Sequence, residues 1–91
     1  MTITMTKYCI MTADLKNVEV GTAKQYHFMP IADLEKSRSK INLFNSKKTA
    51  ISSFERCWWY ATWDAEKDAF INQQGNVSWV VRKLTITYEL E

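Results

Sequence analysis

The sequence has few of the residues from which most catalytic sites are built. It contains one histidine, His27, and two cysteines, Cys9 and Cys57. A catalytic relay that pairs histidine with serine or cysteine would have to use His27, and no neighbouring pattern indicates a partner for it. A zinc site needs about four ligands, whereas these three residues are widely spaced and form no C-x-x-C pair. We therefore predict that the protein is not an enzyme, that it holds no metal or cofactor, and that His27 lies on the surface.

Glycine, proline and long apolar runs are also scarce. Two Gly and one Pro argue against a disordered or low-complexity chain, and no Gly-rich phosphate-binding loop is present. No segment approaches the roughly 20 apolar residues of a membrane-spanning helix, and the Thr-rich start of the sequence is unlike a signal peptide. We expect a cytoplasmic protein, acting in a bacterial host cell, that makes no membrane contact.

The residues that are abundant indicate one small folded domain, residues 1–91. Of these residues 46% are hydrophobic and 13% are aromatic, and large rings fill a small core efficiently. Cys9 falls on a predicted strand and Cys57 on the apolar face of a predicted helix, where free cysteine packs as a small hydrophobe. A disulfide between the two cysteines stays open at this point.

The segment 40–63 organises the predicted fold. Alternation of apolar and polar residues favours a short strand over 40–44, and Asn45 and Ser46 are typical N-caps of the helix that follows. We expect this helix to continue to about Tyr60. Its apolar residues recur at three- and four-residue steps and form one stripe; they are Ala50, Ile51, Phe54, Cys57, Trp58 and Ala61.

Alternation of apolar and polar residues predicts three further strands. They cover 3–13, 18–29 and 77–90, with a bend at Gly21 in the second of them. The first two strands would form a hairpin around a turn at 14–17. In the last strand the apolar residues change parity, which favours a twist or a bulge near Arg82.

Two segments allow more than one interpretation. Residues 32–39 fit a loop or a single helical turn capped by Asp33. Residues 63–74 fit a second short helix or a strand. The acids Asp64, Glu66 and Asp68 alternate here, but the glycine and closing glutamate of a calcium loop are missing. We interpret these acids as the solvated start of the second helix.

The order of predicted elements indicates an α+β protein. Three strands precede the main helix, and one strand follows the ambiguous segment. The expected architecture is a single antiparallel sheet of about four strands packed on one main helix, with the second short helix as a possible addition.

The charge of the chain is unevenly distributed although its net value is only +2. The segment 36–56 carries six basic residues and one acid, Glu55. Lys47 and Lys48 fall in the first turn of the predicted helix, where cations oppose the helix dipole, which hints at a negatively charged partner. The alternative is that these are ordinary solvated charges. The partner-binding residues that we predict are Lys36, Arg38, Lys40, Lys47, Lys48, Arg56 and Trp59.

Trp59 is included because of the aromatic cluster that ends the predicted helix. On that helix Trp58 faces the core, and Trp59 and Trp63, four residues apart, share a neighbouring face. Most of the cluster is expected in the core. An exposed Trp59 would suit a protein interface, where tryptophan is a frequent hot spot, or would stack on a nucleic-acid base.

Residues 40–54, KINLFNSKKTAISSF, together with the closing strand VVRKLTITYEL, are similar to a pattern in small orphan proteins of bacteriophages. The resemblance covers about half the chain and carries no catalytic residue. It implies a host-takeover or counter-defence protein of the anti-CRISPR kind, which occupies a surface of a host nucleoprotein machine without catalysis. The expected partner is then a host protein or nucleoprotein complex, such as a CRISPR effector, with contact to its guide RNA or target DNA.

Two other functions fit the same residues. A small nucleic-acid-binding accessory protein would use the basic residues on free DNA or RNA, and its binding would fall steeply with salt. An assembly subunit would pair through an exposed sheet edge. In solution we expect a monomer or a weak dimer.

Overall fold

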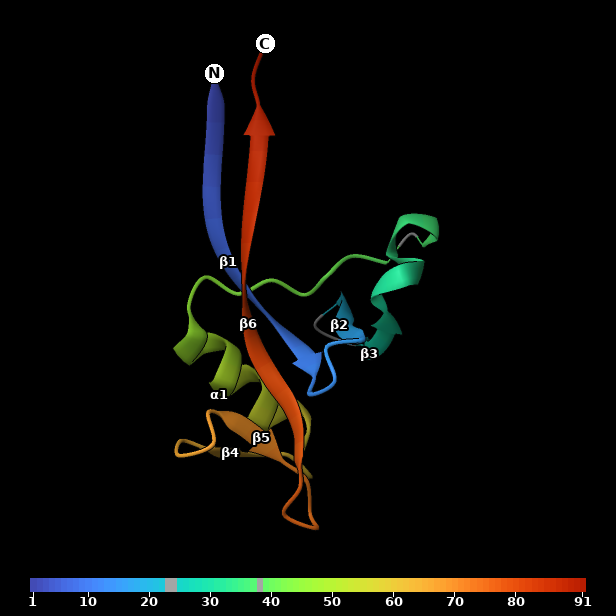
Figure 1. The fold of residues 1–91 in the computed structure, drawn as a ribbon, viewed down its shortest axis with the longest axis vertical. Helices are drawn as coiled ribbons and strands as arrows, with labels where there is room; N and C mark the ends of the chain where they lie inside the picture. Colours follow the sequence, from blue (N-terminus) through green and yellow to red (C-terminus); the bar gives the residue numbers. More distant parts are fainter. Residues whose placement is uncertain (23–24, 38) are drawn as a thin grey trace.

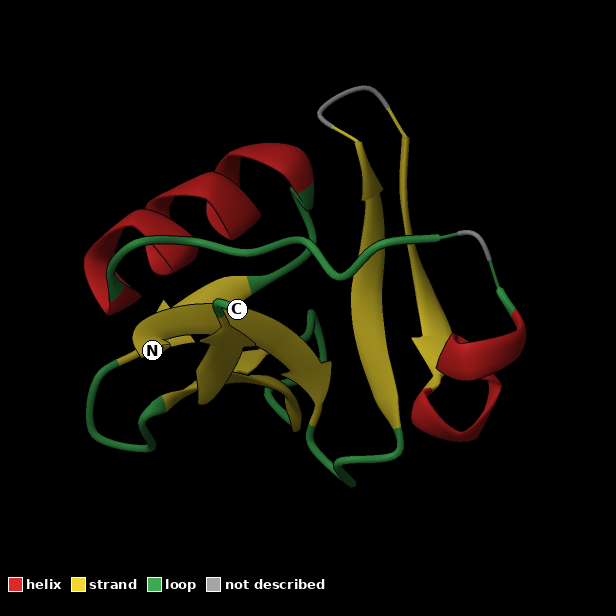
Figure 2. Cartoon of the chain, turned by 90° about the horizontal axis from the view of Figure 1, so that it is seen from above, coloured by secondary structure: helices red, strands yellow, loops and turns green. Residues whose placement is uncertain are grey.

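The computed structural model describes residues 1–22, 25–37 and 39–91, and its centre is a six-stranded antiparallel sheet that curls into a half-barrel (Figure 1). The strands lie in the order β3-β2-β1-β6-β5-β4. One α-helix packs on one face of the sheet, and a 3-10 helix follows β3 at the opposite side of the molecule (Figure 2). The elements are β1 (Thr2–Thr12), β2 (Asn17–Thr22), β3 (Gln25–Pro30), η1 (Ile31–Lys36), α1 (Lys47–Cys57), β4 (Thr62–Asp64), β5 (Ala69–Ile71) and β6 (Val77–Glu89).

The predicted architecture of about four strands on one main helix is therefore wrong. The strand predictions at the two ends of the chain are confirmed by β1 and β6, which pair with each other from Thr2↔Glu89 to Thr12↔Trp79. The extra strands come from the segments 18–29 and 63–74. α1 covers only part of the sheet, so the sheet dominates the fold (Figure 2).

The predicted single strand over 18–29 is two strands, β2 and β3, which pair from Asn17↔Pro30 to Thr22↔Gln25. The predicted bend at Gly21 coincides with a φ of 120°, which only glycine adopts easily. Residues 23–24, which connect the two strands in the sequence, are outside the described residues. The predicted hairpin of β1 and β2 exists, although their pairing is short, at Met11↔Val18.

The sheet has a hydrophobic core on each face, and this explains the change of parity along β6. On the helix side Ile10, Phe54 and Phe70 form the first core, and Trp79 and Val81 pack against it. On the other side Cys9, Val18 and Val20 form the second core, with Leu84 packed against it. The pairing of β6 with β1 is in unbroken register through Arg82. A bulge is not needed there, because each half of β6 buries the residues that face its own core.

The segment 40–44 is not a strand, contrary to the prediction. Ile41 forms a single bridge to Val20, and Phe44 forms a single bridge to Tyr8. The segment crosses from η1 to α1 over the sheet and contacts two strands in turn (Figure 2). Two isolated contacts fix its apolar residues but do not make a ladder.

The start of α1 is as predicted, and its end is not. The Ser46 hydroxyl accepts a hydrogen bond from the Thr49 backbone N–H at 3.1 Å, as an N-cap does. The helix ends at Cys57, and the backbone N–H of Ala61 donates to the Trp58 carbonyl in the turn that follows. Cys57 is therefore exposed rather than packed on the apolar stripe. Both cysteines are free.

The segment 63–74 contains a strand hairpin, which confirms the strand interpretation and not the second helix. β4 pairs with β5 through Trp63↔Phe70, whose rings lie 4.9 Å apart. The predicted shared helical face of Trp59 and Trp63 is thus wrong, because Trp63 belongs to the sheet. The Asp64 carboxylate accepts from the backbone N–H groups of Glu66 and Lys67 and closes the turn, so these acids do not begin a helix.

The segment 31–36 is a helical turn, as one of the two interpretations proposed. η1 follows Pro30, which occupies the N-cap position and makes no side-chain cap bond. Asp33 lies inside the first turn and is not its cap. No described helix is long and apolar enough to cross a membrane.

Candidate polyanion-binding surface

The predicted binding residues are spread over the molecule and are not gathered in one site. Lys36 ends η1, and Lys40 lies in the segment that leads to α1. η1 and α1 lie on opposite sides of the sheet in both ribbon views (Figures 1 and 2). Arg38 is outside the described residues. These residues therefore follow a path across the surface instead of forming a compact pocket.

The remaining predicted residues belong to α1 or follow it. Lys47 and Lys48 are exposed in the first turn of α1, and Arg56 is exposed in its last turn. The two ends are about 13 Å apart, at 1.5 Å per residue. Trp59 follows the helix and is 79% exposed. An interface residue has to be exposed, and Trp59 meets this condition. Its contact with a partner stays a prediction.

One of the predicted residues, Lys47, lines a pocket of about 330 Å³ beside β6. The pocket is formed where the start of α1 approaches the paired strands β1 and β6. Tyr8 and Lys83 are directly opposite in the register of these strands and so share one face of the sheet. The lining residues, hereafter the basic pocket, are Tyr8, Lys47, Val81, Arg82 and Lys83.

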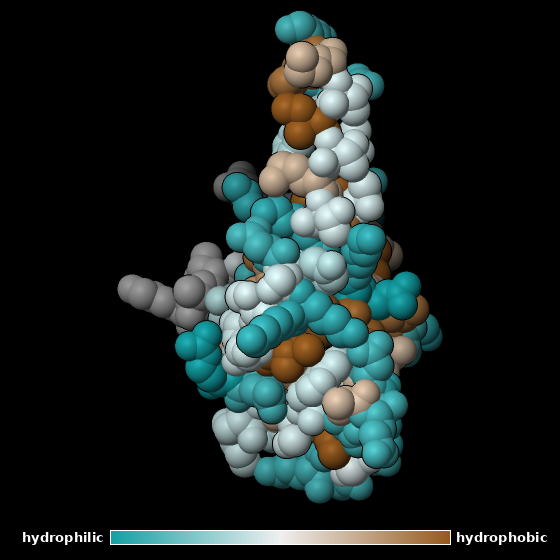
Figure 3. Space-filling model, turned by 90° about the vertical axis from the view of Figure 1, so that its left-hand side faces the viewer, coloured by the Kyte–Doolittle hydropathy of each residue, from teal (hydrophilic) through white to brown (hydrophobic). Residues whose placement is uncertain are grey.

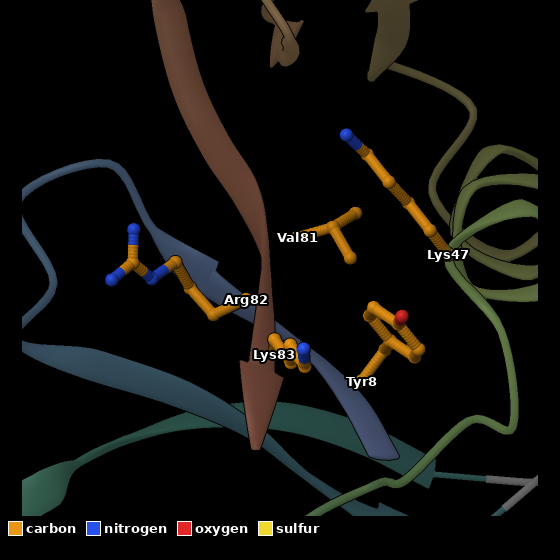
Figure 4. A pocket seen from close by; sticks show the side chains of 5 residues that line it. All are labelled: Tyr8, Lys47, Val81, Arg82 and Lys83. Atoms are coloured by element: carbon orange, nitrogen blue, oxygen red, sulfur yellow. The ribbon is translucent and has the colours of Figure 1, made fainter. Parts of the chain in front are cut away.

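The close-up of the basic pocket shows how these side chains lie (Figure 4). Tyr8, Val81 and Lys47 are on the same side of β6, and Arg82 extends to the opposite side. This agrees with the register, in which Arg82 is opposite Cys9 and belongs to the other face. Lys47 and Lys83 with the Tyr8 hydroxyl are therefore the polar groups on the pocket side of the sheet, and the Arg82 side chain lies on the opposite face.

Lys47 is held over the pocket by exposed contacts. Its Nζ lies 2.5 Å from an Asp68 carboxylate oxygen and 5.7 Å from the centre of the Trp63 ring. Both partners of the ion pair are exposed, with side-chain exposures of 45% for Lys47 and 68% for Asp68. An exposed ion pair contributes about 0–1 kcal/mol. Lys47 can thus exchange Asp68 for another anion at little cost.

The chemistry of the basic pocket suits an oxyanion. The polar side chains on its side of the sheet supply two ammonium groups and a phenol, and all of these donate hydrogen bonds to phosphate oxygens. None of its lining residues is acidic. Among the described residues, no cluster of three or more His, Cys, Asp or Glu side chains is arranged to hold a metal ion. His27 is exposed, as predicted.

The sequence did not reveal Tyr8, Arg82 and Lys83 as part of this surface. Arg82 and Lys83 are visible as a basic pair in the last strand, but only the pairing of β1 with β6 brings them to Tyr8. The start of α1 reaches them because segment 40–46 carries it across the sheet (Figure 2). The signal that the sequence offers is this basic pair on the predicted strand 77–90.

A second feature that the sequence did not reveal is a buried carboxylate. Glu19 is 2% exposed. It accepts hydrogen bonds from Asn42 Nδ2 at 2.8 Å and from Trp58 Nε1 at 3.2 Å. Burial raises the pKa of Glu19, and the two donors oppose this effect. The side chain joins β2 to the end of α1 and to segment 40–44, so we assign it a structural role.

Comparisons with protein-family models, with curated proteins and with solved structures found no match to this chain.

Proposed function

We propose that this protein is a non-enzymatic inhibitor that binds a host defence nucleoprotein complex and blocks its engagement of target nucleic acid. The observation that carries the proposal is the basic pocket, in which Lys47, Lys83 and Tyr8 line one cavity. Such an arrangement fits a phosphate group of bound RNA or DNA. The basic residues on α1 and on the segment before it would extend the contact.

The choice of target rests on the sequence resemblance. The segment KINLFNSKKTAISSF is similar to a pattern in small phage proteins that act on host machines, and a CRISPR effector is the proposed complex. The exposed Trp59, close to Arg56 in the chain, offers an anchor for the protein part of such a complex. Phosphate contacts and an aromatic anchor together match a surface made of both RNA and protein.

The first test is capture of partners from a bacterial lysate that contains an active CRISPR effector. Tagged protein is used with and without nuclease, and bound proteins and RNA are identified. Recovery of a nuclease-resistant complex in fixed stoichiometry is the expected result. If all bound material disappears on nuclease treatment, the inhibitor proposal is rejected in favour of a protein that binds free nucleic acid.

Charge reversal tests the surface itself. The variant Lys47→Glu with Lys83→Glu should lose capture, and Lys16→Glu is the matched control because Lys16 is exposed in the turn after β1. A glutamate at position 47 also suits the start of a helix, so folding should persist. Equal capture by the double variant and the control would show that the basic pocket makes no contact with the complex.

The alternative, binding to free nucleic acid, is distinguished by salt. Each phosphate that the protein neutralises adds about one unit to the slope of log affinity against log salt. Binding through the basic pocket to a free single strand should therefore weaken by orders of magnitude between low and physiological salt. A complex that includes a desolvated Trp59 contact should depend on salt much less.

A further inference from the structure

The ends of β1 and β6 form a two-stranded ribbon that projects from the rest of the sheet (Figure 1). β2 pairs with β1 only at Met11, and β5 pairs with β6 only near Trp79 and Val77. In the described chain the ribbon thus has two edges without a further strand. A two-stranded ribbon alone is only marginally stable in water, which raises the question of what covers it.

The two faces of this ribbon differ sharply in polarity. The register pairs Ile3 with Tyr88 and Met5 with Ile86 on one face. The other face carries a row of threonines: Thr2, Thr4, Thr6, Thr85 and Thr87. Figure 3 shows hydrophobic side chains gathered along one side of the projecting ribbon and weakly polar ones along the other.

The apolar face of the ribbon is exposed, and an apolar groove lies at its base. Ile3, Met5, Tyr88 and Leu90 are between 39% and 52% exposed. At the base of the ribbon, Leu84 lines a groove of about 220 Å³ whose other lining residues are Cys9, Met11, Val18, Ile31, Leu34 and Ile41. Cys9 and Met11 have the same parity as Met5, so the groove and the apolar face lie on the same side of the sheet, with Lys7 opposite Leu84 between them.

We propose that this surface is covered by the same surface of a second copy of the chain, in a two-fold symmetric dimer. A two-fold contact needs a projection and a recess on one surface, each fitting the other in the partner. Here Tyr88 projects near the tip, and the groove beside Leu84 is the recess. They are four residues apart on β6, about 13 Å. The two-fold axis then passes near the Met5–Ile86 pair, and Tyr88 of each copy lies over the groove of the other.

The area available agrees with a weak dimer. A large side chain has roughly 200 Å² of surface, and the four exposed ribbon side chains are each about half exposed. With the groove and the half-buried Leu84 and Ile86, each copy would bury about 500 Å². The total of about 1,000 Å² is at the lower limit of specific interfaces. We therefore expect dissociation in the micromolar range.

This dimer is independent of the proposed function. Tyr8 and Lys83 of the basic pocket have the parity of the threonine face. The dimer would cover the opposite face, to which the Arg82 side chain extends, and would leave Tyr8, Lys47 and Lys83 of both basic pockets accessible. If a different protein covered the apolar face instead, the pure chain would stay monomeric.

The first measurement is the mass of the pure protein by sedimentation velocity from about 5 to 500 μM, a range that brackets a micromolar dissociation constant. A shift from one chain to two is expected. Ile86→Glu should keep the protein monomeric, and the control Thr87→Glu, its neighbour on the other face, should not. Monomer throughout the range, or equal loss of dimer in both variants, would overturn the proposal. Far-ultraviolet circular dichroism checks that both variants are folded.

A cross-linking experiment keeps the proposal testable if Ile86→Glu unfolds. In a Cys57→Ser background, which removes the exposed thiol, Ile86→Cys should give a covalent dimer with a short bifunctional maleimide. The residue lies near the two-fold axis, and such a reagent spans the roughly 10 Å between packed sheets. Thr85→Cys, on the threonine face, is the control and should not cross-link. Equal cross-linking at both positions would reject face-to-face packing.

Discussion

Replacement of Glu19 tests how the sheet is joined to the end of the helix. Its carboxylate is the acceptor for the side chains of Asn42 and Trp58. Glu19→Ala would leave both donors without this acceptor, and a buried donor without a partner costs about 1–3 kcal/mol. Part of that cost is offset, because the substitution also removes a buried charge. We expect the free energy of unfolding to fall by about 2–3 kcal/mol.

The isosteric variant Glu19→Gln separates the charge from the packing. Because burial raises the pKa of Glu19 in the folded protein, its stabilising contribution is fully present below the unfolded-state pKa near 4.5. That contribution is lost as pH rises through the folded-state pKa. Glutamine does not titrate. The stability of Glu19→Gln minus that of the unmodified protein should therefore be larger at pH 7 than at pH 4.

Urea unfolding at pH 4, 5, 6 and 7 measures this difference. A difference of about 1.4 kcal/mol in unfolding free energy moves a urea midpoint by about 1 M at a typical slope. The control is Glu35→Gln, which removes a charge from an exposed position on η1. A difference between Glu19→Gln and the unmodified protein that is constant with pH, or that shrinks toward pH 7, would refute the reasoning.

Two further predictions follow from the cores. Phe54 is buried, and its ring centre lies 4.7 Å from that of Phe70 and 5.6 Å from that of Trp79. Phe54→Ala should lower the free energy of unfolding, measured with urea, by about 3–5 kcal/mol. A decrease below about 1 kcal/mol would contradict the assigned core. Burial raises the pKa of the Cys9 thiol to about 11, whereas Cys57 is exposed. A thiol reagent at pH 8 should therefore modify one cysteine per folded chain, and Cys57→Ser should abolish that reaction. Rapid modification of both cysteines would be inconsistent with the burial of Cys9.

The long elements of this fold could be predicted because their patterns extend over many residues. β1 and β6 extend over 11 and 13 residues, and Ser46 is followed by a regular apolar stripe, so their local signals are strong. The strands β4 and β5 have three residues each, which is too short for periodicity to distinguish strand from helix. Only the contact of Trp63 with Phe70 decides between them.

Other errors arose because a local pattern has more than one structural solution. Segment 40–44 alternates like a strand, but Ile41 and Phe44 each contact a different strand. The parity change in β6 suggested a bulge, because a single core was assumed. A sheet with a core on each face gives the same pattern without a bulge. The basic pocket was missed for a related reason, since it depends on the pairing of Tyr8 with Lys83 across the whole chain.

The same pairing gives the ribbon two surfaces that can be tested separately. Side chains alternate between the faces of a strand, so substitution of Lys83 changes the basic pocket and substitution of Ile86 changes the apolar face. Both residues lie on β6, yet each substitution leaves the other surface intact. Loss of partner capture with a retained dimer therefore assigns the polyanion contact to the threonine side. Loss of the dimer with retained capture assigns the self-association to the apolar side, so failure of one proposal does not imply failure of the other.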